Sequence, residues 1–300
     1  MGSKTIKSEN SKLVIAISSR ALFDLDHSHK IFKEEGIEAY ASHQQENEHV
    51  ILEPGVGFTL VKKLLKLNSK KTPIDVILLS RNSADTGLRI FNSIEHYGLN
   101  ISRAAFTRGE STHPFVGAFE ADLFLSSNYN DVQKALQSGY AAASIVESKS
   151  KNSHPSQLRI AFDGDAVIFS DEAERIFQEK GLEAFHENEV MSEKIELKAG
   201  PFKSFLVSLQ KIQSTFPEED NPIRTALVTA RSAPSHKRVI HTMREWGIRI
   251  DESFFLGGLD KGVFLRQFAA DIFFDDQQQH CYSASQYVPT GHVPSGIKNR

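Results

Sequence analysis

The strongest constraint on this chain is an internal repeat, because a duplicated sequence must fold into two similar units. The segment Leu13–Asp26 aligns with Leu158–Asp171, which lies 145 positions later. The same offset continues downstream, where Ile31–Tyr40 matches Ile176–Phe185 at six of ten positions. A constant offset over two separate segments indicates a duplication and not a chance similarity.

The repeat continues to the end of each half with one small insertion. Ala121–Ser127 aligns with Ala270–Asp276 at an offset of 149, so the second copy is four residues longer. The Pro-containing loop Phe216–Pro222 is the natural place for these extra residues. We therefore expect two similar halves, residues 13–147 and 158–300, joined by a polar Ser- and Lys-rich linker.

Both halves alternate short β-rich runs with longer helical patterns. In the second half, four continuously apolar runs indicate strands buried on both faces, namely residues 158–162, 225–228, 252–256 and 272–274. Residues 201–212 and 234–245 between them have helical spacing, each with a proline near the start. Alternation of this kind predicts an α/β fold with parallel sheets covered by helices.

The composition excludes several classes of protein. With 40% hydrophobic and 24% charged residues, the chain is typical of a globular protein. The formal net charge of −3 does not favour a nucleic-acid partner or an anionic membrane surface. A single cysteine, Cys281, excludes a disulfide framework within the chain and a cysteine-based zinc cluster.

The sequence also bears on location. We found no run approaching the roughly 18–20 apolar residues of a membrane helix. Residues 1–12 are polar, lack the apolar stretch of a signal peptide, and are expected to form a flexible leader. We therefore expect a cytoplasmic protein with a small-molecule substrate and no nucleic-acid or membrane partner, and we expect a homo-oligomer.

Residues suited to phosphate chemistry follow the candidate strands of the second half. They are Asp163 and Asp165, Thr229, Lys261, and the pair Asp275 and Asp276. Taken singly, each has an ordinary structural role, since Asp-Gly-Asp is a common turn and a threonine after a strand often caps a helix. Because the carboxyl ends of parallel strands meet at one edge of a sheet, the full set favours a catalytic interpretation.

The two carboxylates of the first loop suit phosphoryl transfer. Asp163 can act as the nucleophile and form an aspartyl-phosphate, while Asp165 can protonate the leaving oxygen and later activate water. Thr229 can donate a hydrogen bond to the phosphate, and Lys261 can supply a fixed positive charge.

So many carboxylates would repel an anionic substrate unless a cation neutralised them. Mg²⁺ prefers oxygen ligands and keeps several waters. Asp163, the backbone carbonyl of Asp165, and Asp275 or Asp276 would form such a site. The sequence therefore predicts Mg²⁺ as a cofactor.

These residues resemble the four motifs of the haloacid-dehalogenase superfamily of phosphatases. The similarity is closer to one family, the cytosolic 5'-nucleotidases of type I, and it extends over most of the chain. The segments that carry it are Ala16–Phe23, Ala161–Glu172, Pro222–Ser232 and Ile272–Gln277, together with Lys261.

The resemblance implies a Rossmann-like fold and Mg²⁺-dependent hydrolysis of nucleoside 5'-monophosphates, with AMP the typical substrate. It implies that Asp163 is the nucleophile and Asp165 the general acid and base. It further implies phosphate binding by Thr229, Ala230 and Lys261, and metal binding by Asp163, Asp165, Asp275 and Asp276. Two alternatives stay open: a phosphatase or phosphotransferase for another small phosphomonoester, and a nucleotide-binding regulator without turnover.

The first half lacks this chemistry at the aligned positions. Ser18 aligns with Asp163, Arg20 with Asp165, Ser80 with Thr229, Thr112 with Lys261, and Ser126–Ser127 with Asp275–Asp276. We therefore interpret residues 13–147 as a degenerate haloacid-dehalogenase-like half that serves as scaffold, cap or regulatory unit. A sharper hypothesis is that Ser18, Arg20 and Ser80 form a metal-free anion site for a regulatory nucleotide.

Overall fold

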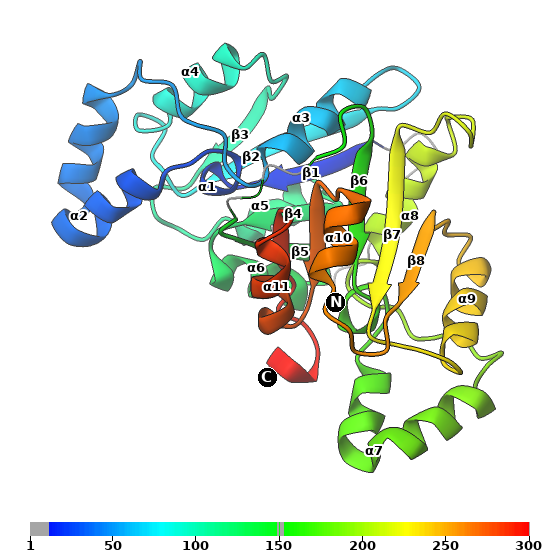
Figure 1. Cartoon of the computed structure of the whole chain (residues 1–300). Helices are drawn as coiled ribbons and strands as arrows, with labels where there is room; N and C mark the ends of the chain where they lie inside the picture. The colour runs from blue at the N-terminus through cyan, green and yellow to red at the C-terminus, as the bar shows by residue number, and fades with distance from the viewer. Residues whose placement is uncertain (1–11, 149, 151–152, 300) are drawn as a thin grey trace.

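The computed structural model describes residues 12–148, 150 and 153–299, so nearly all of the predicted leader lies outside the described residues. The described chain forms a sheet of ten strands (Figure 1). In chain order these are β1 (Leu13–Ile17), β2 (Ile74–Ser80), β3 (Arg103–Phe106), β4 (Leu123–Ser126), β5 (Ala141–Val146), β6 (Leu158–Phe162), β7 (Ile223–Thr229), β8 (Glu252–Phe255), β9 (Ile272–Asp275) and β10 (Thr290–His292).

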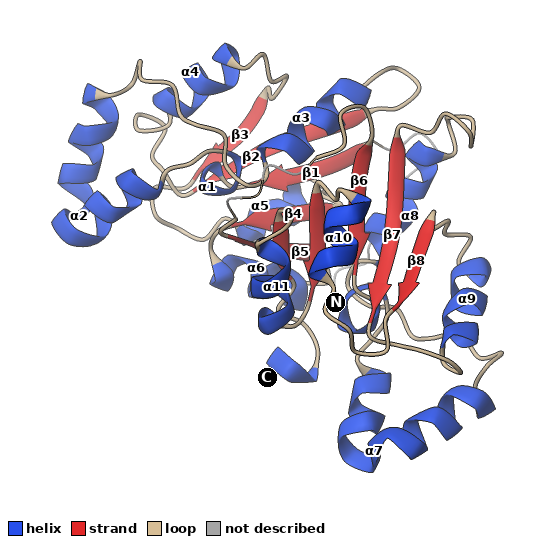
Figure 2. Cartoon of the chain, viewed as in Figure 1, coloured by secondary structure: helices blue, strands red, loops and turns tan. Residues whose placement is uncertain are grey.

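Helices lie on both faces of the sheet (Figure 2). They are α1 (Ser19–Leu22), α2 (Asp26–Glu46), α3 (Phe58–Leu67), α4 (Leu88–His96), α5 (His113–Ala118), α6 (Tyr129–Gln137), α7 (Glu172–Met191), α8 (Lys203–Gln213), α9 (His236–Glu245), α10 (Gly262–Phe268) and α11 (Gln278–Ser285), with short turns η1 (Gly164–Ile168) and η2 (Ile297–Asn299). Among the described helices, none combines the length and apolar character needed to cross a membrane.

The predicted α/β class and the four strands of the second half are confirmed within a residue or two. The strand order is β3-β2-β1-β4-β5-β10-β9-β6-β7-β8, and only the β5–β10 pair is antiparallel. We expected a sheet in each half, but the described strands form one continuous sheet. The reason is β10, which pairs with β9 on one side and with β5 on the other.

The hydrophobic core also joins the two halves. One cluster of buried residues contains Ile15 and Phe58 from the first half together with Phe162 and Phe205 from the second. Helix α3 packs against β6, and α8 packs against β1, so each half covers the first strand of the other. The opposite face of the sheet carries two separate clusters, one in each half.

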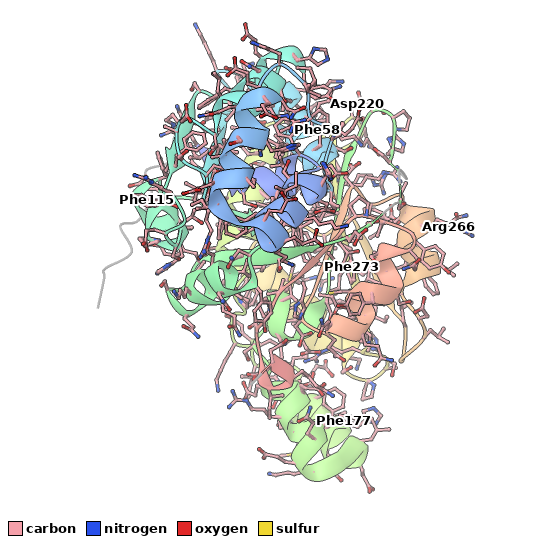
Figure 3. All side chains as sticks on the ribbon, turned by 90° about the vertical axis from the view of Figure 1, so that its left-hand side faces the viewer. Phe58, Phe115, Phe177, Asp220, Arg266 and Phe273 are labelled. Carbon is pink, nitrogen blue, oxygen red and sulfur yellow. The ribbon has the colours of Figure 1, made fainter. Side chains whose placement is uncertain are left out.

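Two long helices, α2 and α7, project from the layered body at opposite ends of the molecule (Figure 1). Each bends sharply at a glycine with positive φ, Gly36 in α2 and Gly181 in α7, a backbone conformation that glycine adopts at little cost. The outer part of α7 carries Phe177, which is 44% exposed (Figure 3). The part of each helix after its bend contacts the loop that follows the second strand of its own half.

Candidate active site

The candidate nucleophile, Asp163, lies at the carboxyl end of a central strand of the sheet. Asp163 follows β6, is buried, and its backbone N–H donates to the carbonyl of Phe274 in β9 at 2.8 Å. Its side chain accepts a 2.7 Å hydrogen bond from the N–H of Gly164. The turn η1 that follows sharply redirects the chain, with Ala166 at a φ of 58°. The carboxylate is therefore held in one position at the edge of the sheet.

Three carboxylates and one ammonium group meet at this edge. Oxygen atoms of Asp163, Asp275 and Asp276 lie within 4.8 Å of one another, and all three residues are buried. Lys261, at the start of α10, places its Nζ 2.9 Å from Asp163 Oδ1 and 2.6 Å from Asp275 Oδ2. The structure thus brings together the candidate nucleophile, the lysine and the aspartate pair that the sequence placed after three different strands.

The charges in this cluster strongly perturb one another. Burial raises the pKa of Asp163 to about 7, despite the attraction of Lys261. Burial, together with the neighbouring Asp163 and Asp275, raises the pKa of Asp276 to about 9. Burial favours the neutral form of Asp275 as well, but Lys261 and His280 outweigh it and lower its pKa to about 2. His280 contributes through Nδ1, which lies 3.4 Å from Asp275 Oδ2.

These shifts show that the donor set suits a divalent cation. One ammonium group does not balance three buried carboxylates, so the pKa values of Asp163 and Asp276 are raised. A cation bound to the same oxygens would supply the missing positive charge. Hard cations such as Mg²⁺ favour oxygen ligands of this kind. The side chain of Asp165 lies outside this cluster, and metal binding through its backbone carbonyl stays a prediction.

Asp165 is held instead by an arginine, Arg231, that was not predicted to be a site residue. Arg231 donates to both carboxylate oxygens of Asp165, at 2.9 and 2.8 Å. Its third contact is Glu189 near the end of α7, at 2.5 Å, and Arg238 binds the same glutamate at 2.9 Å. Arg231 is 5% exposed, and these carboxylates outweigh its burial and raise the pKa of its guanidinium. The network connects α7 to the candidate acid.

Only one part of this network had a sequence signal. Arg231 follows Thr229 by two residues, and a cation so close to a strand end was a detectable clue. Glu189 and Arg238 lie on helices with no motif, and only folding brings them together.

The side-chain oxygen of Thr229 accepts the N–H of Arg231 at 3.2 Å. It also lies 3.2 Å from where a Cβ on Gly164 would stand, so Thr229 and Ala230 border the Asp163 loop.

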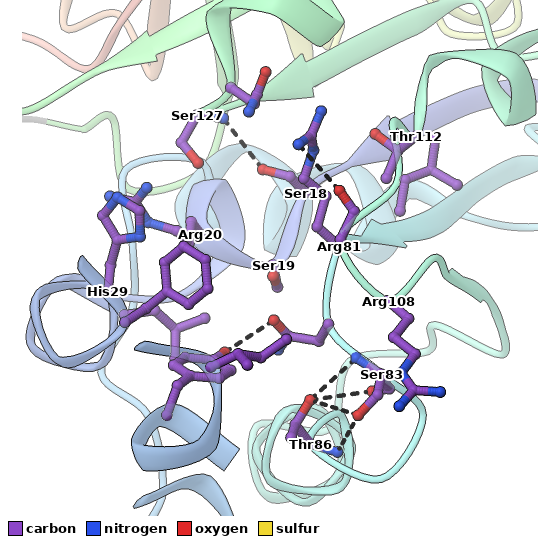
Figure 4. A pocket seen from close by; sticks show the side chains of 18 of the residues that line it. Ser18, Ser19, Arg20, His29, Arg81, Ser83, Thr86, Arg108, Thr112 and Ser127 are labelled. Atoms are coloured by element: carbon purple, nitrogen blue, oxygen red, sulfur yellow. Dashed lines mark hydrogen bonds between the residues drawn. The ribbon is translucent and has the colours of Figure 1, made fainter. Parts of the chain in front are cut away.

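The first half has a pocket of about 1040 Å³ at the aligned strand ends (Figure 4). Ser18, Arg20 and Thr112 line it, as the repeat predicts. Ser80 is not among the lining residues, and its part in the predicted anion site stays a prediction. Its side chain is fully buried behind the wall of the pocket, where it lies 3.1 Å from the hydroxyl of Ser19 and accepts the N–H of Asn82.

Comparison with known proteins gives a consistent result. The 5'-nucleotidase family profile matches residues 5–300 of the chain. Cytosolic 5'-nucleotidase 1B of Homo sapiens is 39% identical over 288 residues, which cover 91% of this chain and 47% of the human protein. The chain thus spans about half the length of that relative. No solved structure matches the chain.

Proposed function

Because the chain belongs to the 5'-nucleotidase family, we propose that it hydrolyses nucleoside 5'-monophosphates, AMP foremost, with Mg²⁺ as cofactor. The observation that carries this proposal is the buried cluster of Asp163, Asp275 and Asp276 around Lys261. Mg²⁺ held by these carboxylates would neutralise the phosphate and leave it open to attack.

In the reaction we propose, a carboxylate oxygen of Asp163 attacks phosphorus, and the bond from phosphorus to the 5'-oxygen breaks. Asp165 gives its proton to the departing 5'-oxygen, which leaves with the nucleoside. Water then attacks the phosphorus of the aspartyl-phosphate and gives a proton to Asp165, and the bond to Asp163 breaks to release phosphate. Thr229, the backbone N–H of Ala230 and Lys261 hold the phosphate oxygens throughout.

The ion pair between Asp165 and Arg231 adds a requirement to this scheme. Both oxygens of Asp165 accept hydrogen bonds from Arg231, so the arginine competes with the leaving oxygen for them. The arrival of substrate has to loosen this pair before Asp165 can transfer a proton. Because Glu189 binds the same arginine, a shift of α7 over the substrate would provide that release.

We infer further that the two halves are haloacid-dehalogenase-like repeats, residues 13–147 and 158–300, and that the first is degenerate. The strand order β3-β2-β1-β4-β5 in one corresponds to β8-β7-β6-β9-β10 in the other. The connections between halves also correspond: Lys63 of α3 bonds Asp271 at 2.7 Å, and the aligned Ser208 of α8 bonds Asp122 at 2.9 Å. A cytoplasmic location and a homo-oligomeric state belong to the same proposal.

The decisive experiment measures phosphate release from AMP with Mg²⁺, for the wild type and Asp163→Asn side by side. We expect turnover that disappears in EDTA and in the variant. A panel of other nucleoside 5'-monophosphates and sugar phosphates ranks the substrates. Turnover of sugar phosphates alone would replace the proposal by another phosphomonoesterase, and no turnover of any substrate would favour a nucleotide-binding regulator.

A further inference from the structure

The pocket of the first half lies where the other half has its carboxylate cluster. It is lined by Ser18 after β1, Arg81 after β2 and Ser127 after β4 (Figure 4), and also by Tyr40 from α2. Its volume of about 1040 Å³ is at the upper end of the range for small-molecule sites. The reaction proposed above does not use it.

Two buried hydrogen-bond donors line this pocket without a partner among the described residues: Arg20 Nε and Asn82 Nδ2. The amide of Asn82 is oriented by a chain of bonds, because Gln44 donates to the hydroxyl of Tyr40 and that hydroxyl donates to Asn82 Oδ1. The guanidinium of Arg20 also binds Asp26 at 3.0 Å, but that carboxylate is largely exposed, so the pair holds it weakly. A ligand that accepts hydrogen bonds would satisfy both donors.

The acidic residues of the pocket do not cancel this preference. Asp131 is buried and binds Arg81 through both oxygens, at 2.8 and 3.0 Å. Asp85 accepts a side-chain amide hydrogen bond at 2.6 Å, and Glu38 is exposed on α2. Arg20 and Arg108 both line the pocket and can supply positive charge to a ligand.

Three large apolar or aromatic side chains of the pocket lining are open to solvent. Phe32 is 44% exposed, Ile37 61% and Tyr129 40%. The ring of His29 stacks on Phe32 with centroids 6.1 Å apart. Burial and the charge of Arg20 lower the pKa of His29, so at neutral pH the imidazole is uncharged and suits an aromatic wall. Flat rings of a ligand could stack here.

We propose that this pocket is a second ligand site, which binds a nucleotide through its phosphate and base without a metal ion. The phosphate lies against Arg20, Asn82 and Ser18, whose hydroxyl accepts two backbone N–H groups and keeps its own proton to donate. The base lies against Phe32 and Tyr129. Serines and an arginine stand where the other half has carboxylates, and they can bind phosphate directly, without a metal ion.

The test is calorimetric titration of the full chain with AMP in excess EDTA, with adenosine and inorganic phosphate as comparison ligands. We expect AMP to bind at least about tenfold more tightly than either fragment, because each contributes only part of the contact. Absence of AMP binding in EDTA, or binding of adenosine equal to that of AMP, would overturn the proposal.

Variants assign the binding to this pocket. Arg20→Ala should remove one AMP site per chain, and Phe32→Ala should weaken that site while leaving inorganic phosphate unaffected. Arg175→Ala is the matched control, because Arg175 is also partly exposed and pairs with an aspartate, but lies on α7 outside the pocket. An unchanged number of sites in Arg20→Ala would refute the assignment. Turnover of AMP with Mg²⁺, measured on the same variants, reports separately on the reaction and verifies that they fold.

Discussion

The two halves of the molecule share a strand order but carry different charges at the carboxyl ends of their strands. In the second half the residues after β6 and β9 are carboxylates, and Lys261 balances part of their charge. In the first half hydroxyls and Arg20 stand at the aligned positions. The same arrangement of strands thus accommodates side chains of opposite charge, and a few residues decide which chemistry each edge can support.

The same contrast extends to the projecting helices. Near the end of α7, Glu189 is buried between two arginines, Arg231 and Arg238. At the aligned position of α2, Gln44 is equally buried but neutral, and it accepts from Arg89 at 3.3 Å. Ion pairs thus connect α7 to Asp165, while hydrogen bonds through Gln44 and Tyr40 orient Asn82 next to α2.

The largest difference in turnover between variants of the two halves is expected when the proposed nucleophile is removed. Asp163→Asn should reduce turnover of AMP more than about 1000-fold, because the amide cannot attack phosphorus. The matched variant Ser18→Ala in the first half should leave turnover within about twofold, since that half holds no reacting group. Steady-state phosphate release measures both. Comparable losses in the two variants would mean that both halves take part in the reaction.

The contacts between halves should differ in strength. Lys63→Ala leaves Asp271 fully buried without its ammonium partner and should cost about 3 kcal/mol of unfolding free energy. Ser208→Ala removes a single hydroxyl from Asp122 and should cost about 1 kcal/mol. Urea unfolding of the two variants gives these values. The reverse ranking would show that the ion pair contributes little to joining the halves.

The arginine beside the acid should affect the rate but not the fold. Arg231→Lys cannot bind both oxygens of Asp165 and the carboxylate of Glu189 at once, so we expect kcat to change about tenfold and its pH profile to shift. Asn82→Ala, at the aligned position of the first half, should leave kcat unchanged. An unaltered pH profile in Arg231→Lys would place Arg231 in a purely structural role.

The smallest expected effect is on the thermal stability at low pH, through Asp131 of the first half. Arg81 and Ser111 outweigh the burial of Asp131 and lower its pKa below the ordinary value near 4. The ionised carboxylate therefore stabilises the fold above that pH, and this stability is lost as the pH falls further. Asp131→Asn should lessen the drop in Tm between pH 5 and pH 3 by a few degrees. Asp26→Asn, in an exposed pair, should leave that drop as it is.

Much of this arrangement could be predicted from residue order alone. The apolar runs of the second half predicted β6 to β9, since a strand buried on both faces has to be apolar throughout. The positions of Asp163, Lys261 and Asp275 directly after or between such runs predicted their meeting, because parallel strands end at one edge. The repeat likewise predicted that Ser18 and Arg20 lie where Asp163 and Asp165 would.

The rest depended on contacts between segments that carry no local signal. The joining of two expected sheets into one rests on β10, three residues long, whose pairing with β5 no periodicity could indicate. The partnership of Arg231 with Glu189 and the burial of Ser80 behind Ser19 depend on how helices and loops pack across the edge. Residue order thus determined which groups reach that edge, while tertiary packing decided which of them face a ligand and which face one another, because burial and hydrogen bonding are properties of the folded surroundings.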